Sequence, residues 1–274
     1  MRRPAAGIAV ALAALLLASC EGSEGSSATT SPASARASEP AGGSHAPSSA
    51  PPTAPATAEP ASGPCANDYQ PVAQGDSWTY DVSGSGGTGY TDTVTNAAAS
   101  GFTITSDFGR LRRQTRWSCR PEGLIALGYG GGAAGSLTSQ GLWASLRTTR
   151  VAGLTVPRSI GLGDTWHQTF GLNGTIEIGG ARTTASGSVD ERFEAHGVVG
   201  VTVPAGTFDA VAIDTMVTFD IQTMVAGVRT PVKVVSTGTT YLARGVGMVK
   251  ATSDTSLFGQ LLSATIELTA YSVS

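Results

Sequence analysis

Apolar and polar side chains alternate along most of the chain after residue 65. In residues 262–271 every second position is apolar: Leu262, Ala264, Ile266, Leu268 and Ala270. Because successive side chains of a strand point to opposite faces, this pattern predicts a strand with one buried face and one wetter face. A sheet that is covered on one side only is typical of antiparallel pairing.

Further segments show the same alternation. A first strand carries Trp78, Tyr80 and Val82 on one face, and a longer strand carries Val211, Ile213, Val217, Phe219 and Ile221 on one face. Between them in the chain, Pro204 presets a turn and Gly206 supplies a left-handed position, which predicts a hairpin over residues 201–213. The chain shows no long amphipathic helix, and residues 139–149 carry only a weak pattern for a short one. The sequence therefore predicts an all-β fold, either an antiparallel curved sheet or an open barrel.

One short motif occurs twice. Residues 75–78 read GDSW and residues 163–166 read GDTW, each at the start of a run of expected strands. A Gly-Asp pair favours a turn because glycine accepts positive φ and aspartate can bond the backbone nearby. The repetition predicts two related β halves, at about 65–127 and 158–274, joined by the glycine-rich residues 128–136 and a further stretch to Pro157. The two copies share no reactive group beyond the turn.

The first twenty residues have the composition of an export signal. Arg2 and Arg3 precede an apolar run over residues 5–18, which is too short to cross a bilayer as a helix. The run ends in Leu-Ala-Ser-Cys, which resembles the lipobox of bacterial lipoproteins and makes Cys20 the expected lipidation site. The alternative is an ordinary signal peptide that is cut near Ala18. Pro4 and the alanines after it do not support a twin-arginine signal, so general secretion is expected.

Residues 21–64 have the composition of a tether. They hold eight of the 14 prolines and contain no Leu, Ile, Val or aromatic residue. Such a segment cannot bury enough apolar surface to offset the entropy of ordering it. The remaining residues, 65–274, form the expected β-rich exported domain. Its localisation is therefore expected to be the bacterial cell envelope, with attachment to a membrane through the lipid on Cys20.

If Cys20 carries lipid, Cys65 and Cys119 remain as a pair. In an exported domain an even pair indicates one disulfide, since oxidised cysteines persist outside the cytoplasm. A metal site would need more ligands than the chain's three histidines easily supply, and a redox pair would have the spacing C-x-x-C. We expect neither a metal nor another cofactor.

The charge of the chain excludes nucleic acid as a partner and leaves an anionic envelope component open. Residues 65–274 contain 16 acidic and 14 basic residues, a net charge of −2, which gives no basic footprint for nucleic acid. The densest charge feature is RLRRQTRWSCR, residues 110–120. As a strand, it presents Arg110, Arg112 and Arg116 on one face, either as a solvated surface or as a surface for an anionic envelope component.

Catalytic patterns are weak. His167 and His196 have no serine in a G-x-S-x-G turn to activate, and the acidic stretch DERFE, residues 190–194, lacks the spacing of a calcium loop. The sequence therefore favours a protein that is not an enzyme.

Three motifs point to a family. G-D-x-W in each half, V-P-A-G-T-F at residues 203–208 and Y-x-A-x-G-V-G-x-V-K at residues 241–250 resemble a group of uncharacterised bacterial envelope lipoproteins, the DUF-type, TapB-like proteins. The resemblance covers most of residues 69–255. It implies a β-rich exported domain and brings no established catalytic residues.

Three functions follow in order of preference. The first is a lipid-anchored binding domain for an apolar or lipid ligand, or for another envelope component. The second is a structural or assembly lipoprotein without a ligand, and the third is an extracytoplasmic hydrolase.

Overall fold

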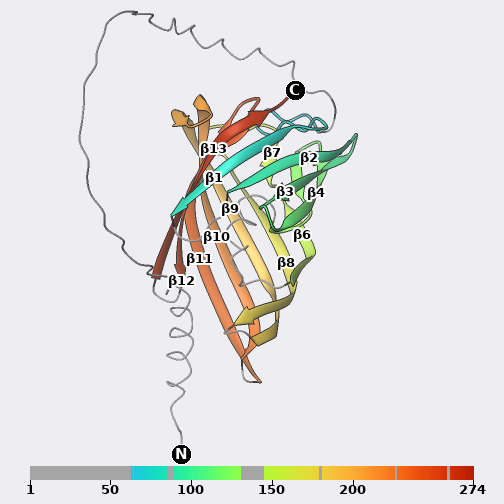
Figure 1. The fold of residues 1–274 in the computed structure, drawn as a ribbon, viewed down its shortest axis with the longest axis vertical. Coiled ribbons are helices and arrows are strands. Elements are labelled where there is room, and N and C mark those ends of the chain that lie inside the picture. Colours follow the sequence, from blue (N-terminus) through green and yellow to red (C-terminus); the bar gives the residue numbers. More distant parts are fainter. Residues whose placement is uncertain are drawn as a thin grey trace, which may run out of the picture. The chain divides into compact units, whose positions relative to one another are not determined.

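The computed structural model describes residue 63 and residues 65–84, 89–130, 145–178, 181–225, 227–257 and 260–274. Lipidation at Cys20 and the tether, except for Gly63, lie outside these residues. The described part consists of strands joined by turns, and the strands form one antiparallel sheet (Figure 1). This confirms the expected all-β, antiparallel fold.

Thirteen strands lie within the described residues, in the sheet order β6-β8-β9-β10-β11-β12-β13-β1-β2-β3-β4-β5-β7. The strands are β1 (Ser77–Gly84), β2 (Tyr90–Ala98), β3 (Gly101–Asp107), β4 (Arg112–Arg120), β5 (Gly123–Ala126), β6 (Ser145–Gly153), β7 (Val156–Pro157), β8 (Thr165–Ile178), β9 (Ala181–Val203), β10 (Gly206–Val225), β11 (Val228–Ala243), β12 (Gly247–Leu257) and β13 (Gln260–Ser272).

The predicted alternation holds for most of the sheet. Trp78 and Tyr80 of β1 are buried, and β13 buries Ala264, Ile266 and Leu268. The expectation for Ala270 is wrong, because Ala270 is exposed. A β-bulge causes this: β1 pairs Thr79 with Ala270 and the next residue, Tyr80, with Leu268. The extra residue shifts the phase, so side chains after the bulge change face.

Two parts of the chain differ from expectation. The weak helix proposed within residues 139–149 is wrong where the structure describes it, because residues from Ser145 onward belong to strand β6. The stretch leading to Pro157 is also more than a connector, since it forms β6 and β7, the two outermost strands of the sheet. Residues 131–144 lie outside the described part.

The two G-D-x-W motifs form the same turn. Asp76 Oδ2 accepts from the backbone N–H of Ala73 at 2.8 Å, and Asp164 Oδ2 accepts from that of Gly161 at 2.7 Å. Each glycine has a positive φ, 94° at Gly75 and 81° at Gly163. Each turn then bonds the neighbouring strand in the same way, the first at Val94 of β2 and the second at Ala195 of β9. The motif is therefore a repeated piece of architecture, and both copies belong to one continuous sheet.

The two edges of the sheet meet beside Thr155, which lies between β6 and β7. Its backbone N–H donates to Leu124 O of β5 at 2.9 Å, and its hydroxyl accepts from the N–H of Ala126 at 2.7 Å. The same hydroxyl donates to Gln168 Oε1 of β8 at 2.6 Å, and Gln168 Nε2 donates to Ala126 O at 3.0 Å. Side-chain and backbone bonds thus join β5 to β8, although among the described strands no ladder pairs the two ends of the sheet.

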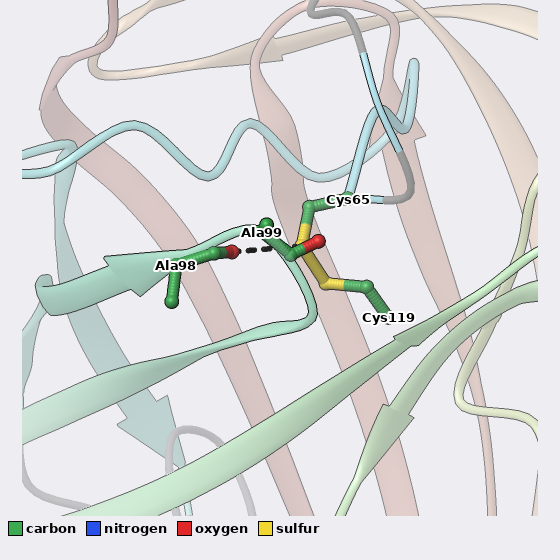
Figure 2. Close-up of a disulfide and its surroundings, with 4 residues drawn as sticks. All are labelled: Cys65, Ala98, Ala99 and Cys119. Carbon is green, nitrogen blue, oxygen red and sulfur yellow. Dashed lines mark hydrogen bonds between the residues drawn. A yellow bond between two sulfur atoms is a disulfide. The ribbon is translucent and has the colours of Figure 1, made fainter.

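The start of the described domain is fixed by the predicted disulfide between Cys65 and Cys119 of β4, whose Cα atoms are 4.9 Å apart (Figure 2). Cys65 Sγ lies 3.5 Å from Ala98 O, where β2 ends. Asn67 Nδ2 then donates to Pro157 O at 2.9 Å. The residues that follow the tether in the chain are therefore bound to β4 and to the end of β7.

Two clusters of buried apolar side chains fill the inner face of the sheet. The larger includes Trp78, Tyr80, Phe102, Ile213 and Leu268, and the smaller includes Phe170, Leu172, Val189 and Ile221. Trp117 of β4 packs against both clusters and stacks on Phe102 with 5.4 Å between ring centroids. One packed interior therefore runs beneath the strands on both sides of the edge contact at Thr155.

Candidate functional site

A hollow with a volume of about 980 Å³ lies on the outer face of strands β8 to β12. Ten of its fifteen lining residues come from two neighbouring rows across the sheet, which the strand register defines. One row contains His167, Arg192, Met216, Thr237 and Asp254, and the other contains Thr165, Glu194, Asp214, Thr239 and Thr252. We call this feature the outer hollow.

The polar groups around the outer hollow are held by hydrogen bonds. Asp214 Oδ2 lies 3.0 Å from His196 Nε2, and its Oδ1 accepts from the Thr239 hydroxyl at 2.9 Å. Arg192 Nε donates to Asp190 Oδ1 at 2.9 Å. Asp214 is therefore fixed from both sides, while Met216 leaves an exposed apolar side chain among the polar ones.

The charge of the outer hollow is negative. Four acidic residues line it, namely Asp190, Glu194, Asp214 and Asp254, against one arginine, Arg192. Carboxylates and hydroxyls accept hydrogen bonds from amines, guanidinium groups and sugar hydroxyls. The described residues contain no group of three or more His, Cys, Asp or Glu side chains placed to hold a metal ion. The outer hollow is therefore suited to a cationic or hydroxyl-rich partner.

The inner face holds two half-buried acidic groups, Asp92 and Glu191. Burial raises the pKa of Asp92 to about 6, against the effect of a hydrogen bond from Ser106. Burial also raises the pKa of Glu191 to about 7, with a further contribution from nearby Asp190. Burial and the charge of Asp92 raise the pKa of Tyr80 and Tyr90 well above the usual value. These carboxyls lie among aromatic rings that make their ionised forms unfavourable.

The inner face also carries apolar side chains that are only half-buried. Val217, Phe219 and Val232 border the smaller apolar cluster on β10 and β11. Tyr129 lies at the same place, with its ring centroid 5.8 Å from that of Phe219 and 5.4 Å from that of Phe170. This part of the inner face is where the described sheet offers apolar surface to a ligand.

The basic run lies on β4 as the sequence predicted. Arg112, Gln114 and Arg116 are exposed, and Thr115 and Cys119 are buried on the opposite face. Arg110 precedes the strand and is exposed as well. Arg113 points to the inner side, and its Nε is buried without a hydrogen-bond partner among the described atoms. Arg112 pairs with Asp107 at 2.7 Å.

The two histidines in the described part of the chain, His167 and His196, lie on the outer face. His167 lines the outer hollow, and His196 contacts Asp214 of β10, which is distant in sequence, instead of the neighbouring DERFE acids. No sequence pattern predicts this contact, because it depends on the pairing of β9 with β10. In the described part of the chain, no helix has the length and apolar character needed to cross a bilayer.

Comparison with known proteins gave three similar solved structures. A protein from Bacteroides fragilis that is thought to be exported and has a YmcC-like fold aligns over 75% of this chain and 99% of its own, at 12% identity and a TM-score of 0.44. A protein from Parabacteroides distasonis thought to be a lipoprotein aligns over 76% and 99%, at 14% identity and a TM-score of 0.43. The hypothetical lipoprotein YmcC from Escherichia coli aligns over 72% and 85%, at 7% identity and a TM-score of 0.33.

At these low scores the likenesses say nothing about what the present chain does. No protein-family model and no curated protein sequence matches the chain. The resemblance to the TapB-like group therefore stays a prediction from short motifs.

Proposed function

We propose that this protein is an exported envelope lipoprotein, anchored through Cys20, whose β-domain binds another envelope component without catalysing a reaction. The outer hollow is the observation that carries the proposal. It is lined by acidic and hydroxyl side chains, and its residues lie on strands of the sheet rather than on loops.

The partner's chemistry follows from that lining. An acidic, hydroxyl-rich surface with one exposed methionine accepts a chain that carries amines or guanidinium groups, or a glycan that carries hydroxyls and amino groups. The packed inner face argues for the outer surface as the binding side, since two clusters of side chains occupy the interior.

Crosslinking in cells tests this function. A photoreactive residue in place of Met216, which is 38% exposed within the outer hollow, should capture a defined envelope component. The matched control is Val228, which is 58% exposed at the β10–β11 turn and does not line the outer hollow. Equal capture from both positions, or none from Met216, would contradict the proposal.

A lipid ligand on the inner face is the second candidate. The half-buried side chains Val217, Phe219 and Val232 favour it. Native mass spectrometry of the protein purified from cells should then show a bound lipid, and substitution of Phe219 by Ser should reduce its occupancy. A protein that carries no lipid and takes up no fluorescent fatty acid would exclude this candidate.

A further inference from the structure

Positive charge is concentrated in one part of the chain. Residues 108–163 contain eight arginines and one acidic residue, Glu122, which gives 8 − 1 = +7. The rest of residues 65–274 contains six basic and 15 acidic residues, which gives −9 and accounts for the total of −2. The near-neutral net charge therefore hides two regions of opposite sign.

The fold brings seven of these arginines to the outer side of the sheet near the place where its edges meet. All seven are exposed: Arg110, Arg112, Arg116, Arg120, Arg147, Arg150 and Arg158. Four come with β4, two come from β6, and one follows β7. We call them the seam arginines.

Hydrogen bonds show that these segments are neighbours. The N–H of Leu127 donates to Arg116 O of β4 at 2.8 Å, and the N–H of Tyr129 donates to the Thr148 hydroxyl of β6 at 2.9 Å. Residues 127–129 thus lie between β4 and β6. At the C-terminal end of β4, the N–H of Arg158 donates to Glu122 O, and Arg158 Nε donates to Pro121 O. Pro121 directly follows Arg120, the last residue of β4.

The tether joins the domain beside this surface. Cys65 is the second residue after Gly63, where the described part begins, and it is bonded to Cys119, which stands next to Arg120 in β4. The seam arginines therefore lie beside the residue at which the segment that follows Cys20 joins the domain.

We propose that the seam arginines dock the domain on the anionic phospholipid surface of the membrane to which the chain is anchored. A guanidinium group presents a planar fork that matches phosphate oxygens. One of the seven, Arg112, also pairs with Asp107 of β3 at 2.7 Å. Clusters of arginine next to a lipid anchor strengthen the attachment to anionic bilayers, by about fivefold per arginine. The inference rests on the proposed lipoprotein function for its choice of membrane.

Vesicle binding tests it without the anchor. The mature chain with Cys20→Ala is incubated with vesicles that contain phosphatidylglycerol or only phosphatidylcholine, and the bound fraction is measured by co-sedimentation. We expect binding to the anionic vesicles that weakens as salt rises, and no binding to the neutral ones. This result does not depend on lipidation, so failure of docking and failure of anchoring are separate outcomes.

A matched pair of variants locates the surface. The triple variant Arg112→Glu, Arg116→Glu and Arg150→Glu should bind anionic vesicles with an affinity lower by a factor of about a hundred or more. This factor follows from the effect of about fivefold per arginine. The control Arg182→Glu, Arg229→Glu and Lys233→Glu changes the charge by the same amount at exposed positions outside the seam and should retain most of the binding. Arg→Gln substitutions at the three seam positions should give an intermediate loss.

Three results would overturn the proposal. They are equal losses in both triple variants, equal binding to neutral and anionic vesicles, and binding of soluble polyphosphate without binding to vesicles.

Discussion

The hydroxyl of Thr155 donates a hydrogen bond to Gln168 Oε1 across 2.6 Å, and Gln168 is fully buried. Through this bond and those to Ala126, strands β5 and β8, each next to an edge strand of the sheet, are held together. The outer hollow begins one residue away, at His167. The contact therefore supports both the curvature of the sheet and the position of the candidate site.

Substitution of Thr155 by Val should destabilise the domain by about 2–4 kcal/mol, because it leaves buried groups of Ala126 and Gln168 without partners. Urea unfolding measures the change. Thr202→Val is the control, since Thr202 is exposed and bonds only the neighbouring Thr207 hydroxyl among the hydrogen bonds described for its side chain. A Thr155→Val domain as stable as the control variant would show that the edges are not held in this way.

The two G-D-x-W turns should differ in their sensitivity to mutation. Asp76 is buried and also accepts from the N–H of Ser274 at 3.0 Å, whereas Asp164 is exposed. Asp76→Ala should therefore cost about 2–3 kcal/mol, and Asp164→Ala about 1 kcal/mol. Chemical denaturation of the two variants checks the order. The reverse order would mean that exposure does not govern the strength of these turns.

Stability should fall as pH rises from about 4 to about 7. The folded-state pKa values of Asp92 and Glu191, about 6 and about 7, lie above their usual values of 3.8 and 4.5. The folded state therefore holds these protons more tightly, and its advantage is lost as pH rises through the folded pKa values. The loss is of the order of 3 kcal/mol for each group.

Substitution of the two carboxyls tests the origin of this slope. The variants Asp92→Asn and Glu191→Gln should each flatten the fall in unfolding free energy between pH 4 and 7, measured by urea titration at each pH. Asp209→Asn, at an exposed position, should leave the slope unchanged. A slope that persists in the double variant Asp92→Asn and Glu191→Gln would assign it to other groups.

The disulfide should contribute about 4 kcal/mol, because it closes a loop with a sequence separation of 54 residues. In urea titrations, the free energy of unfolding of the double variant Cys65→Ala and Cys119→Ala should be lower by this amount, and it should not change when reductant is added. The unmodified protein should lose the same stability when it is reduced. A reduced protein as stable as the oxidised one would mean that the disulfide adds nothing to the fold.

Local patterns along the sequence were enough to predict the kind of fold. The alternation in residues 211–221 predicted one buried face, and Ile213 and Ile221 are buried. The same reasoning failed at Ala270, because a bulge adds a residue on one strand and reverses the faces beyond it. A bulge is fixed by pairing with another strand. In this chain the buried face continues after the bulge at Tyr271 and Val273, which pack against the larger cluster.

The candidate site could not be predicted in this way. The outer hollow takes residues from five strands that run from Thr165 to Asp254, and their proximity depends on the register of four strand pairs. The seam arginines, too, could be predicted only in part from the sequence. The run on β4 was visible in the sequence, but its continuation by Arg147, Arg150 and Arg158 depends on the meeting of the sheet edges.

Labelling with an alkyne fatty acid in cells tests the central claim, which is an envelope protein held at a membrane through Cys20. We expect the unmodified protein to incorporate the label and to fractionate with membranes, and a Cys20→Ala protein to do neither. Cys65→Ala and Cys119→Ala together should leave the label in place, because those residues form the disulfide. Label retained in Cys20→Ala, or absent from the unmodified protein, would contradict the account.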